Sequence, residues 1–468
     1  MKGKIEQNKE PNRLPSAIIK LAKEPRTIIL VKGSPGTGKT SLAMEIARIV
    51  GKAILVTFGR DSEAIKKRFP WVKQEALAVL DVSLQLKQNG TARATLAERV
   101  RELSIQISGL DASFSNALVI LDDVGSFLSG LPPGDAEGQH VSFLEALRDT
   151  IDAPLLLVSD GERCTGIESR ADAILALHDD LLDGRVMRFL EFVKFPSAPR
   201  RYKKIPFSLF NGRFTAGIAL ARVDIENSGK WIVAADPPGA YSTGSEKIDA
   251  IYNECFKLSS FNLMEIDPDL PLSACNFFLS AIINFLWQDR AVILAPVTGI
   301  NTILLGKNDF PLFVEAEMMA NNLRVLEERT GVITECRPYI VQLDNREKDL
   351  FKIFMEIYDS FTCQKIFSPL FSIIEFTSLD YRSDGMLKQI LNHAKFVKNA
   401  NVIEFAVVHS GIDSEFKAQL ASIATTHTKL QVVEGDVILF TSMRPRSSHF
   451  FVELDTPIMP KIRLIPVL

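Results

Sequence analysis

"ILVKGSPGTGKTSL", residues 29–42, decides the fold of the first part of the chain. It fits the pattern G-x-x-x-x-G-K-[ST] without departure, from Gly33 through Gly38 to Lys39 and Thr40. A β-branched apolar run precedes the loop and apolar residues at helical spacing come after it, which is the context the motif requires. Glycines let successive backbone N–H groups and the helix N-terminus surround a polyphosphate. The stretch therefore predicts a nucleotide-binding site.

The residue types in and near this loop predict how ATP and Mg²⁺ are held. We expect Lys39 to meet the β- and γ-phosphates and to assist catalysis, and Thr40 to give its hydroxyl to Mg²⁺. Asp122 ends an aliphatic strand and is expected to bind Mg²⁺ directly or through one of its ligands. The alternative is an aspartate at a strand end that only contacts solvent. Asp123 either orients water, as a catalytic residue, or caps the segment after the strand. The expected nucleotide-binding residues are Gly33, Ser34, Pro35, Gly36, Thr37, Gly38, Lys39, Thr40 and Ser41.

Hydrophobic periodicity predicts an α/β domain around the loop. Short continuous apolar runs alternate with helical patterns, which is typical of a parallel sheet covered on both faces. Three more clearly alternating runs come next and predict antiparallel strands at one edge of the sheet, so that the first domain ends near residue 222. The predicted parallel strands are 27–31, 53–58, 117–123 and 154–160, the helices 40–50, 96–107 and 141–151, and the edge strands 173–177, 185–195 and 205–214.

Composition limits the class of protein. The chain has 468 residues, of which 46% are apolar and 24% charged, with a formal net charge of −3. This predicts two or three globular units and gives no bulk electrostatic attraction to nucleic acid. The five cysteines are scattered without CxxC spacing, and the beginning of the sequence lacks the apolar segment of a signal peptide. We expect a cytoplasmic protein with no membrane association.

Several stretches resemble the KaiC branch of the RecA superfamily of P-loop ATPases. They are "ALVILDD" (117–123), "PLLLVSD" (154–160) and "ADAILALHDDLLDGRVMRFLEFVKF" (171–195). Within that branch, "FPW" (69–71) and the basic link before "NGRF" (211–214) resemble the archaeal gas-vesicle regulatory proteins called GvpD. The resemblance implies an ATP-dependent repressor that acts by binding a transcriptional activator of gas vesicle genes.

The sequence departs from the KaiC pattern where hydrolysis is supported. Gly59 and Arg60 stand where these enzymes carry paired glutamates, and a guanidinium cannot accept a proton from water. We therefore expect slow or no hydrolysis unless Asp61 or Asp123 substitutes, and a role for Arg60 in sensing the γ-phosphate. Lys194, which in the family can reach a neighbouring subunit's nucleotide, is retained, whereas Phe195 replaces the arginine that usually comes after it.

An internal repeat predicts a second domain of the same fold. "SAIIKLAKEPR" (16–26) and "SAIINFLWQDR" (280–290) share five of eleven positions, and each precedes an aliphatic run. On this alignment, "AVILAPVTGINTILL" (291–305) takes the place of the glycine loop and lacks its lysine. We predict two RecA-like domains in tandem: an ATP-binding domain over 1–222, a linker over 223–235 and a degenerate domain without a functional P-loop over 236–468. "FSIIEF" (371–376), "FAVVHSG" (405–411) and 429–454 then match the later strands of the first copy.

A basic cluster is the remaining candidate site. Arg200, Arg201, Lys203 and Lys204 could bind an acidic protein partner, an adjacent subunit of a homo-oligomer or nucleic-acid phosphates, and a solvated surface is the equal alternative. Two further functions stay open. One is an active KaiC/RecA-like ring ATPase in signalling or DNA transactions, and the weaker one is a small-molecule kinase.

Overall fold

The computed structural model describes most of the chain as two compact units. One comprises residues 1–217 with 467–468, and the other residues 218–466. No described helix is long and apolar enough to cross a membrane. The described residues are 14–57, 62–82, 96–125, 136–160, 165–196, 202–220, 230–252, 254–270, 276–295, 313–328, 337–344, 346–363, 367–376, 384–456 and 459–468.

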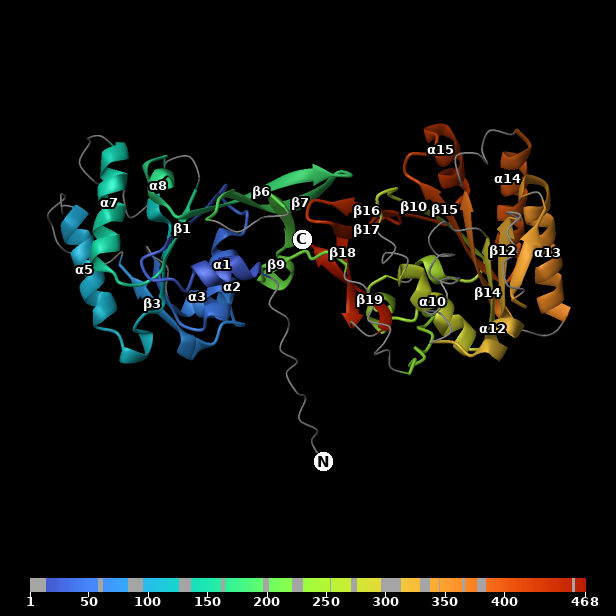
Figure 1. The fold of residues 1–468 in the computed structure, drawn as a ribbon, viewed down its shortest axis with the longest axis horizontal. Helices are drawn as coiled ribbons and strands as arrows, with labels where there is room; N and C mark the ends of the chain where they lie inside the picture. Colours follow the sequence, from blue (N-terminus) through green and yellow to red (C-terminus); the bar gives the residue numbers. More distant parts are fainter. Residues whose placement is uncertain are drawn as a thin grey trace, which may run out of the picture. The chain divides into compact units, whose positions relative to one another are not determined.

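The first unit is built on a sheet of nine described strands in the order β3-β2-β4-β5-β1-β6-β7-β8-β9 (Figure 1). The pairs from β3 to β6 are parallel and β6 to β9 pair antiparallel, which confirms the predicted parallel centre and antiparallel edge. The strand predicted over 205–214 is divided into β8 and β9, because residues 210–212 form a short 3-10 turn. The strands are β1 (Ile28–Gly33), β2 (Ala53–Thr57), β3 (Leu77–Asp81), β4 (Leu118–Asp122), β5 (Leu155–Ser159), β6 (Ala173–Leu182), β7 (Arg185–Lys194), β8 (Lys204–Ser208) and β9 (Thr215–Ala216).

Helices cover both faces of this sheet. Alternate residues of each central strand point to opposite faces, so that Ile29 and Val31 pack with α1 (Ser16–Leu21) and α2 (Lys39–Val50), while Ile28 and Leu30 pack with α5 (Leu96–Ser108) and α7 (Ala136–Thr150). Helices α5 and α7 lie side by side (Figure 1). The short helices α3 (Ser62–Arg68) and α8 (Thr165–Arg170) complete the unit.

Because β1, β5 and β4 pair in parallel, their carboxyl ends meet at one edge of the sheet.

The second unit repeats this arrangement with ten described strands, in the order β13-β12-β11-β14-β15-β10-β16-β17-β18-β19. The pairs from β13 to β16 are parallel, and β16 to β18 pair antiparallel. The strands are β10 (Ser260–Ile266), β11 (Arg290–Ala295), β12 (Leu323–Glu328), β13 (Ile340–Leu343), β14 (Phe367–Phe376), β15 (Val402–His409), β16 (Thr426–Val433), β17 (Val437–Arg444), β18 (His449–Thr456) and β19 (Met459–Val467). The two mostly parallel sheets agree with two RecA-like domains in tandem.

The sheet order corrects the predicted alignment of the repeat. In the first unit the glycine-loop strand β1 lies between β5 and β6, and the strand in that place in the second unit is β10, between β15 and β16. The helix after β10 is α10 (Asn276–Trp287), so "SAII" at 280–283 lies in the counterpart of α2 and not of α1. The prediction that 291–305 replaces the glycine loop was therefore wrong by one strand and one helix. The strand order supports the matches predicted for β14, β15 and β16 to β18.

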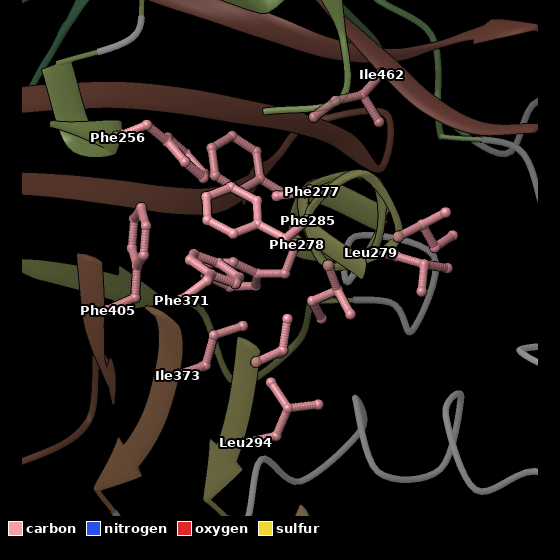
Figure 2. Close-up of a cluster of buried hydrophobic side chains, with 14 of the residues drawn as sticks. Phe256, Phe277, Phe278, Leu279, Phe285, Leu294, Phe371, Ile373, Phe405 and Ile462 are labelled. Carbon is pink, nitrogen blue, oxygen red and sulfur yellow. The ribbon is translucent and has the colours of Figure 1, made fainter. Parts of the chain in front are cut away.

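Aromatic rings fill the core between α10 and the second sheet (Figure 2). Phe371 lies at their centre, with ring centroids 5.1 Å from Phe285, 5.7 Å from Phe256 and 5.9 Å from Phe405. Because large rings bury much apolar area and prefer edge or offset contacts, this cluster fixes α10 on the sheet. The opposite face is covered by α13 (Arg346–Cys363), α14 (Asp384–Asn399) and α15 (Ser414–Ile423), and α9 (Glu246–Asp249) and α12 (Ala316–Asn322) complete the unit.

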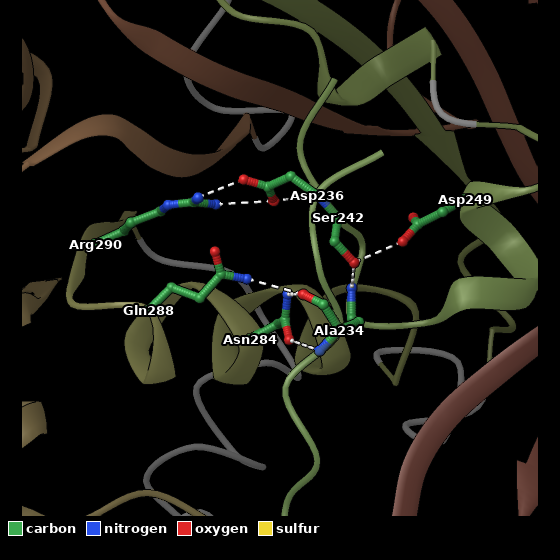
Figure 3. A network of polar contacts seen from close by, with 8 residues as sticks. Ala234, Asp236, Ser242, Asp249, Asn284, Gln288 and Arg290 are labelled. Atoms are coloured by element: carbon green, nitrogen blue, oxygen red, sulfur yellow. Dashed lines mark hydrogen bonds and ion pairs between the residues drawn. The ribbon is translucent and has the colours of Figure 1, made fainter. Parts of the chain in front are cut away.

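Polar contacts attach residues 230–249 to α10 and to the start of β11 (Figure 3). The side chain of Asn284 accepts from the backbone N–H of Ala234 at 2.8 Å and donates to its carbonyl at 3.1 Å. Arg290 pairs with Asp236, which also accepts from the N–H of Ser242 at 3.0 Å. Residues 230–235, which the sequence analysis placed in the linker, are thus held within the second unit.

Candidate nucleotide-binding site

The glycine loop connects the end of β1 to the start of α2. Gly33 pairs with Leu177 of β6, and a Cβ on Gly33 would lie 2.3 Å from the Leu177 carbonyl oxygen, so only glycine allows these strands to approach. Gly38 caps α2 with a φ of 99°, in the left-handed region that favours glycine. The loop is closed by Thr37, whose hydroxyl donates to the Ser34 carbonyl at 2.8 Å. The backbone therefore turns directly into a helix N-terminus.

Lys39 lies folded back over this loop. Its Nζ donates to the carbonyls of Gly33 at 2.7 Å and Ser34 at 2.9 Å, and it lies 2.8 Å from Oδ1 of Asp160. The residue is 8% exposed. An ammonium has three hydrogens to donate, and these three acceptors account for all of them.

Thr40 and Asp122 meet beside Lys39. The Thr40 hydroxyl donates to the Asp122 carboxylate, with its Oγ1 3.1 Å from Oδ1 and 3.3 Å from Oδ2. Asp122 is the last residue of β4 and is buried. It lies on the same sheet face as Leu118 and Ile120, which pack with α2, and this alternation aims its carboxylate at the helix start. Hydroxyl and carboxylate oxygens are the ligands and second-sphere partners that Mg²⁺ prefers, so these two residues fit the predicted metal role.

Asp160 is the residue of this site that the sequence analysis missed. It comes directly after β5, and β5 lies between β4 and β1 in the sheet. Its side chain is 65% exposed and reaches the otherwise buried ammonium of Lys39. The signal was present in "PLLLVSD", because a carboxylate after a buried central strand lies at the same edge as the glycine loop. Asp123, which the sequence predicts as a catalytic residue together with Lys39, comes directly after Asp122 with a φ of 80°.

The other predicted sites have mixed outcomes. Arg60, Asp61, Arg200 and Arg201 lie outside the described residues, so their roles stay predictions. Lys194, at the end of β7, donates to the Ser169 carbonyl of α8 at 3.2 Å.

The two described lysines of the basic cluster contact the neighbouring strand β7. Lys203 pairs with Glu191 at 3.0 Å, and its hydrogen bond lowers the pKa of that carboxyl. The Nζ of Lys204 lies 4.2 Å from the centroid of the Phe189 ring. Both contacts tie the cations to their own sheet.

The second unit carries a different pair in the corresponding place. In the first unit, Asp122 is opposite Val158 of β5, which is opposite Val31 of β1. In the second unit, Glu375 is opposite Val407 of β15, which is opposite Met264 of β10. Val31 and Val158 pack on the α2 side and Met264 and Val407 on the α10 side, so Glu375 takes the place of Asp122.

His409 takes the place of Asp160, because it lies two residues after Val407 as Asp160 lies two residues after Val158. Its Nε2 lies 2.7 Å from Oε1 of the fully buried Glu375. This hydrogen bond raises the pKa of His409. The connection from β10 to α10, residues 267–275, contains no glycine or lysine and includes Asp267 and Asp269. The two functional positions thus contact each other, and the sequence that replaces the glycine loop contains two aspartates.

The polar groups at the glycine loop of the first unit fit a nucleoside triphosphate with Mg²⁺. Lys39 and the backbone N–H groups at the start of α2 would hold phosphate oxygens, while Thr40 and Asp122 would hold the metal. Bound Mg²⁺ neutralises phosphate charge and fixes its geometry. The pair at Glu375 and His409 lacks the lysine ammonium that would hold phosphate.

The comparisons with known proteins agree with this geometry. Residues 23–214 match the model of the KaiC ATPase family. The search of curated proteins found no relative of significant similarity. The matched range contains the glycine loop, Asp122, Asp160 and the edge hairpin of β6 and β7. Residues 23–214 are therefore similar to the KaiC ATPases of the RecA-like P-loop superfamily.

Proposed function

We propose that this chain is an ATP-dependent regulator that binds another protein and hydrolyses ATP slowly or not at all. The observation that carries the proposal is the convergence of Lys39, Thr40 and Asp122 at one edge of the first sheet. ATP and Mg²⁺ are the ligands that this set and the KaiC-like match support.

Slow hydrolysis is proposed from the sequence between β2 and α3. Gly59 and Arg60 replace the paired glutamates of KaiC-like enzymes, and general-base assistance is worth roughly 10²–10⁴-fold in rate. A bound nucleotide that persists is suited to signalling, because its γ-phosphate can hold a loop in one conformation.

The second unit is proposed to serve binding to a partner rather than nucleotide chemistry. Its glycine-loop counterpart is acidic, and Glu375 and His409 occupy the functional positions. The partner that the resemblance to the gas-vesicle regulators implies is a transcriptional activator, with repression of gas vesicle genes as the outcome.

Two measurements test this function. Single-turnover hydrolysis by the purified full chain should be slow and unchanged by DNA, and complex formation with a transcriptional activator encoded beside this chain should differ between ATP and ADP. Equal complex formation with ATP, with ADP and without nucleotide contradicts the regulator.

An active ring ATPase is the second candidate, favoured by the match to an ATPase family over 23–214. Rapid single-turnover hydrolysis that increases with DNA would establish that function instead.

A further inference from the structure

The phosphate-binding ammonium of the first unit already has an anionic partner. Lys39 contacts two backbone carbonyls and one carboxylate, that of Asp160. A carbonyl carries only a partial charge, whereas the carboxylate carries a full one, so Asp160 supplies the counter-charge that a buried ammonium requires.

We propose that Asp160 acts as an internal substitute for phosphate and sets the preference of this site between nucleoside di- and triphosphates. The inference rests on the proposed nucleotide binding and names a residue that regulates that same site. Asp160 is a positioning residue, because it acts through Lys39.

Nucleotide binding must break at least one of the three contacts of Lys39, because its hydrogens are all in use. The carbonyls of Gly33 and Ser34 belong to the loop backbone and cannot leave without reshaping the loop. Asp160 is 65% exposed at the end of β5, and its side chain can rotate into water. The exchange is therefore a phosphate oxygen for the Asp160 carboxylate.

This exchange is easier for a diphosphate than for a triphosphate. The lysine of this motif reaches the β- and γ-phosphates, so the γ-phosphate brings additional negative charge to the ammonium that Asp160 holds. The γ-phosphate and the Asp160 carboxylate are both negative and would repel each other near Lys39. Salt screens this repulsion and weakens it. Asp160 is expected to lower the affinity for ATP more than that for ADP.

The test is the ratio of the dissociation constants for ATP and ADP, measured by isothermal titration of the full chain with Mg²⁺. Asp160→Asn removes the charge and keeps the size of the side chain. Asp149→Asn is the matched control, because Asp149 is an exposed aspartate near the end of α7 that leads into β5, at the opposite end of that strand. Asp160→Ala checks that any effect depends on the charge and not on the amide.

We expect Asp160→Asn and Asp160→Ala to tighten ATP binding about two- to fivefold and ADP binding less than about twofold, because exposed charge pairs contribute up to about a fivefold change in affinity. The shift in the ratio should shrink at high salt, and the control should leave the ratio unchanged. A merely structural role for Asp160 would change both affinities in parallel and independently of salt.

Two outcomes separate this inference from the proposed function. If the wild-type chain binds both nucleotides and Asp160→Asn leaves the ratio unchanged or weakens ATP, the role of Asp160 is refuted and nucleotide binding stands. If the wild-type chain binds neither nucleotide, both are refuted.

Discussion

Replacing Asp122 by asparagine tests the metal side of the site through its dependence on Mg²⁺. Asparagine keeps an oxygen that can accept the Thr40 hydroxyl, which lies 3.1 Å from Oδ1 of Asp122, and removes only the charge. A Mg²⁺ ion binds oxygen at about 2.1 Å. An ion on the Thr40 hydroxyl would therefore lie within about 5 Å of the carboxylate.

The magnitude is set by this separation. A charge of +2 and a charge of −1 that are 5 Å apart attract each other by about 1.7 kcal/mol even at the dielectric constant of water, and by more in a partly buried site. About 1.4 kcal/mol corresponds to a factor of ten in affinity. We expect Asp122→Asn to reduce the gain in ATP affinity that Mg²⁺ provides by about tenfold or more.

Without metal, the effect of Asp122→Asn on ATP affinity is expected to change sign, and this change is the internal control of the assay. Wild type and Asp122→Asn are titrated with ATP in Mg²⁺ and in a chelator. In the chelator the variant should bind ATP at least as tightly as wild type, because the carboxylate no longer repels the phosphates. If both proteins gain equally from Mg²⁺, Asp122 does not serve the metal and the reasoning is refuted.

Three further changes test other parts of the structure. Phe371→Ala empties the centre of the aromatic cluster (Figure 2) and should destabilise the second unit by about 3–5 kcal/mol in chemical denaturation, while ATP binding to the folded protein is retained. Gly33→Ala places a methyl group against the Leu177 carbonyl and should destabilise the first unit by about 1–3 kcal/mol, measured in the same way, and weaken ATP binding. His409 has a raised pKa, so the stability from its contact with Glu375 is fully present below pH 6.5 and lost as pH rises through the raised pKa. The difference in melting temperature between wild type and His409→Gln should accordingly shrink as the pH rises above 6.5, and a constant difference would contradict this linkage.

Local patterns were sufficient to predict most of the first sheet. The central strands are continuous aliphatic runs, and the loop from Gly33 to Thr40 combines the residues that both its conformation and its chemistry require. The antiparallel edge was predicted from alternation, although β6 extends to Leu182 and turns through two residues, Asp183 and Gly184. The short strand β3 was missed, because four of its five residues are only partly buried and give a weak pattern.

The first strand of the second sheet could not be predicted in the same way. β10 contains Asn262 and Glu265, which interrupt its apolar pattern. Both are buried with partners far along the chain: Asn262 accepts from the Thr426 hydroxyl at 2.8 Å, and Glu265 contacts His427 at 2.6 Å and Lys417 at 3.0 Å. Buried polar groups are stable only when such partners exist, and a single stretch of sequence does not reveal them.

The alignment of the repeat failed for a related reason. "SAII" occurs in both α1 and α10, and a short match between helices reflects the apolar residues that both bury as readily as a shared position. Strand order decides the correspondence, because β10 and β1 hold the same place among their neighbours. The same order identifies Glu375 and His409 as the counterparts of Asp122 and Asp160.

The number of ATP molecules bound per chain tests the central claim most directly. Equilibrium titration of the full chain with Mg²⁺ and ATP should give one site for the wild type. The same titration should give no site for the Lys39→Ala variant. Its circular dichroism should match that of the wild type, which shows that the variant is folded. Two sites in the wild type, or one that survives the loss of Lys39, would contradict an account in which the first unit alone holds the nucleotide.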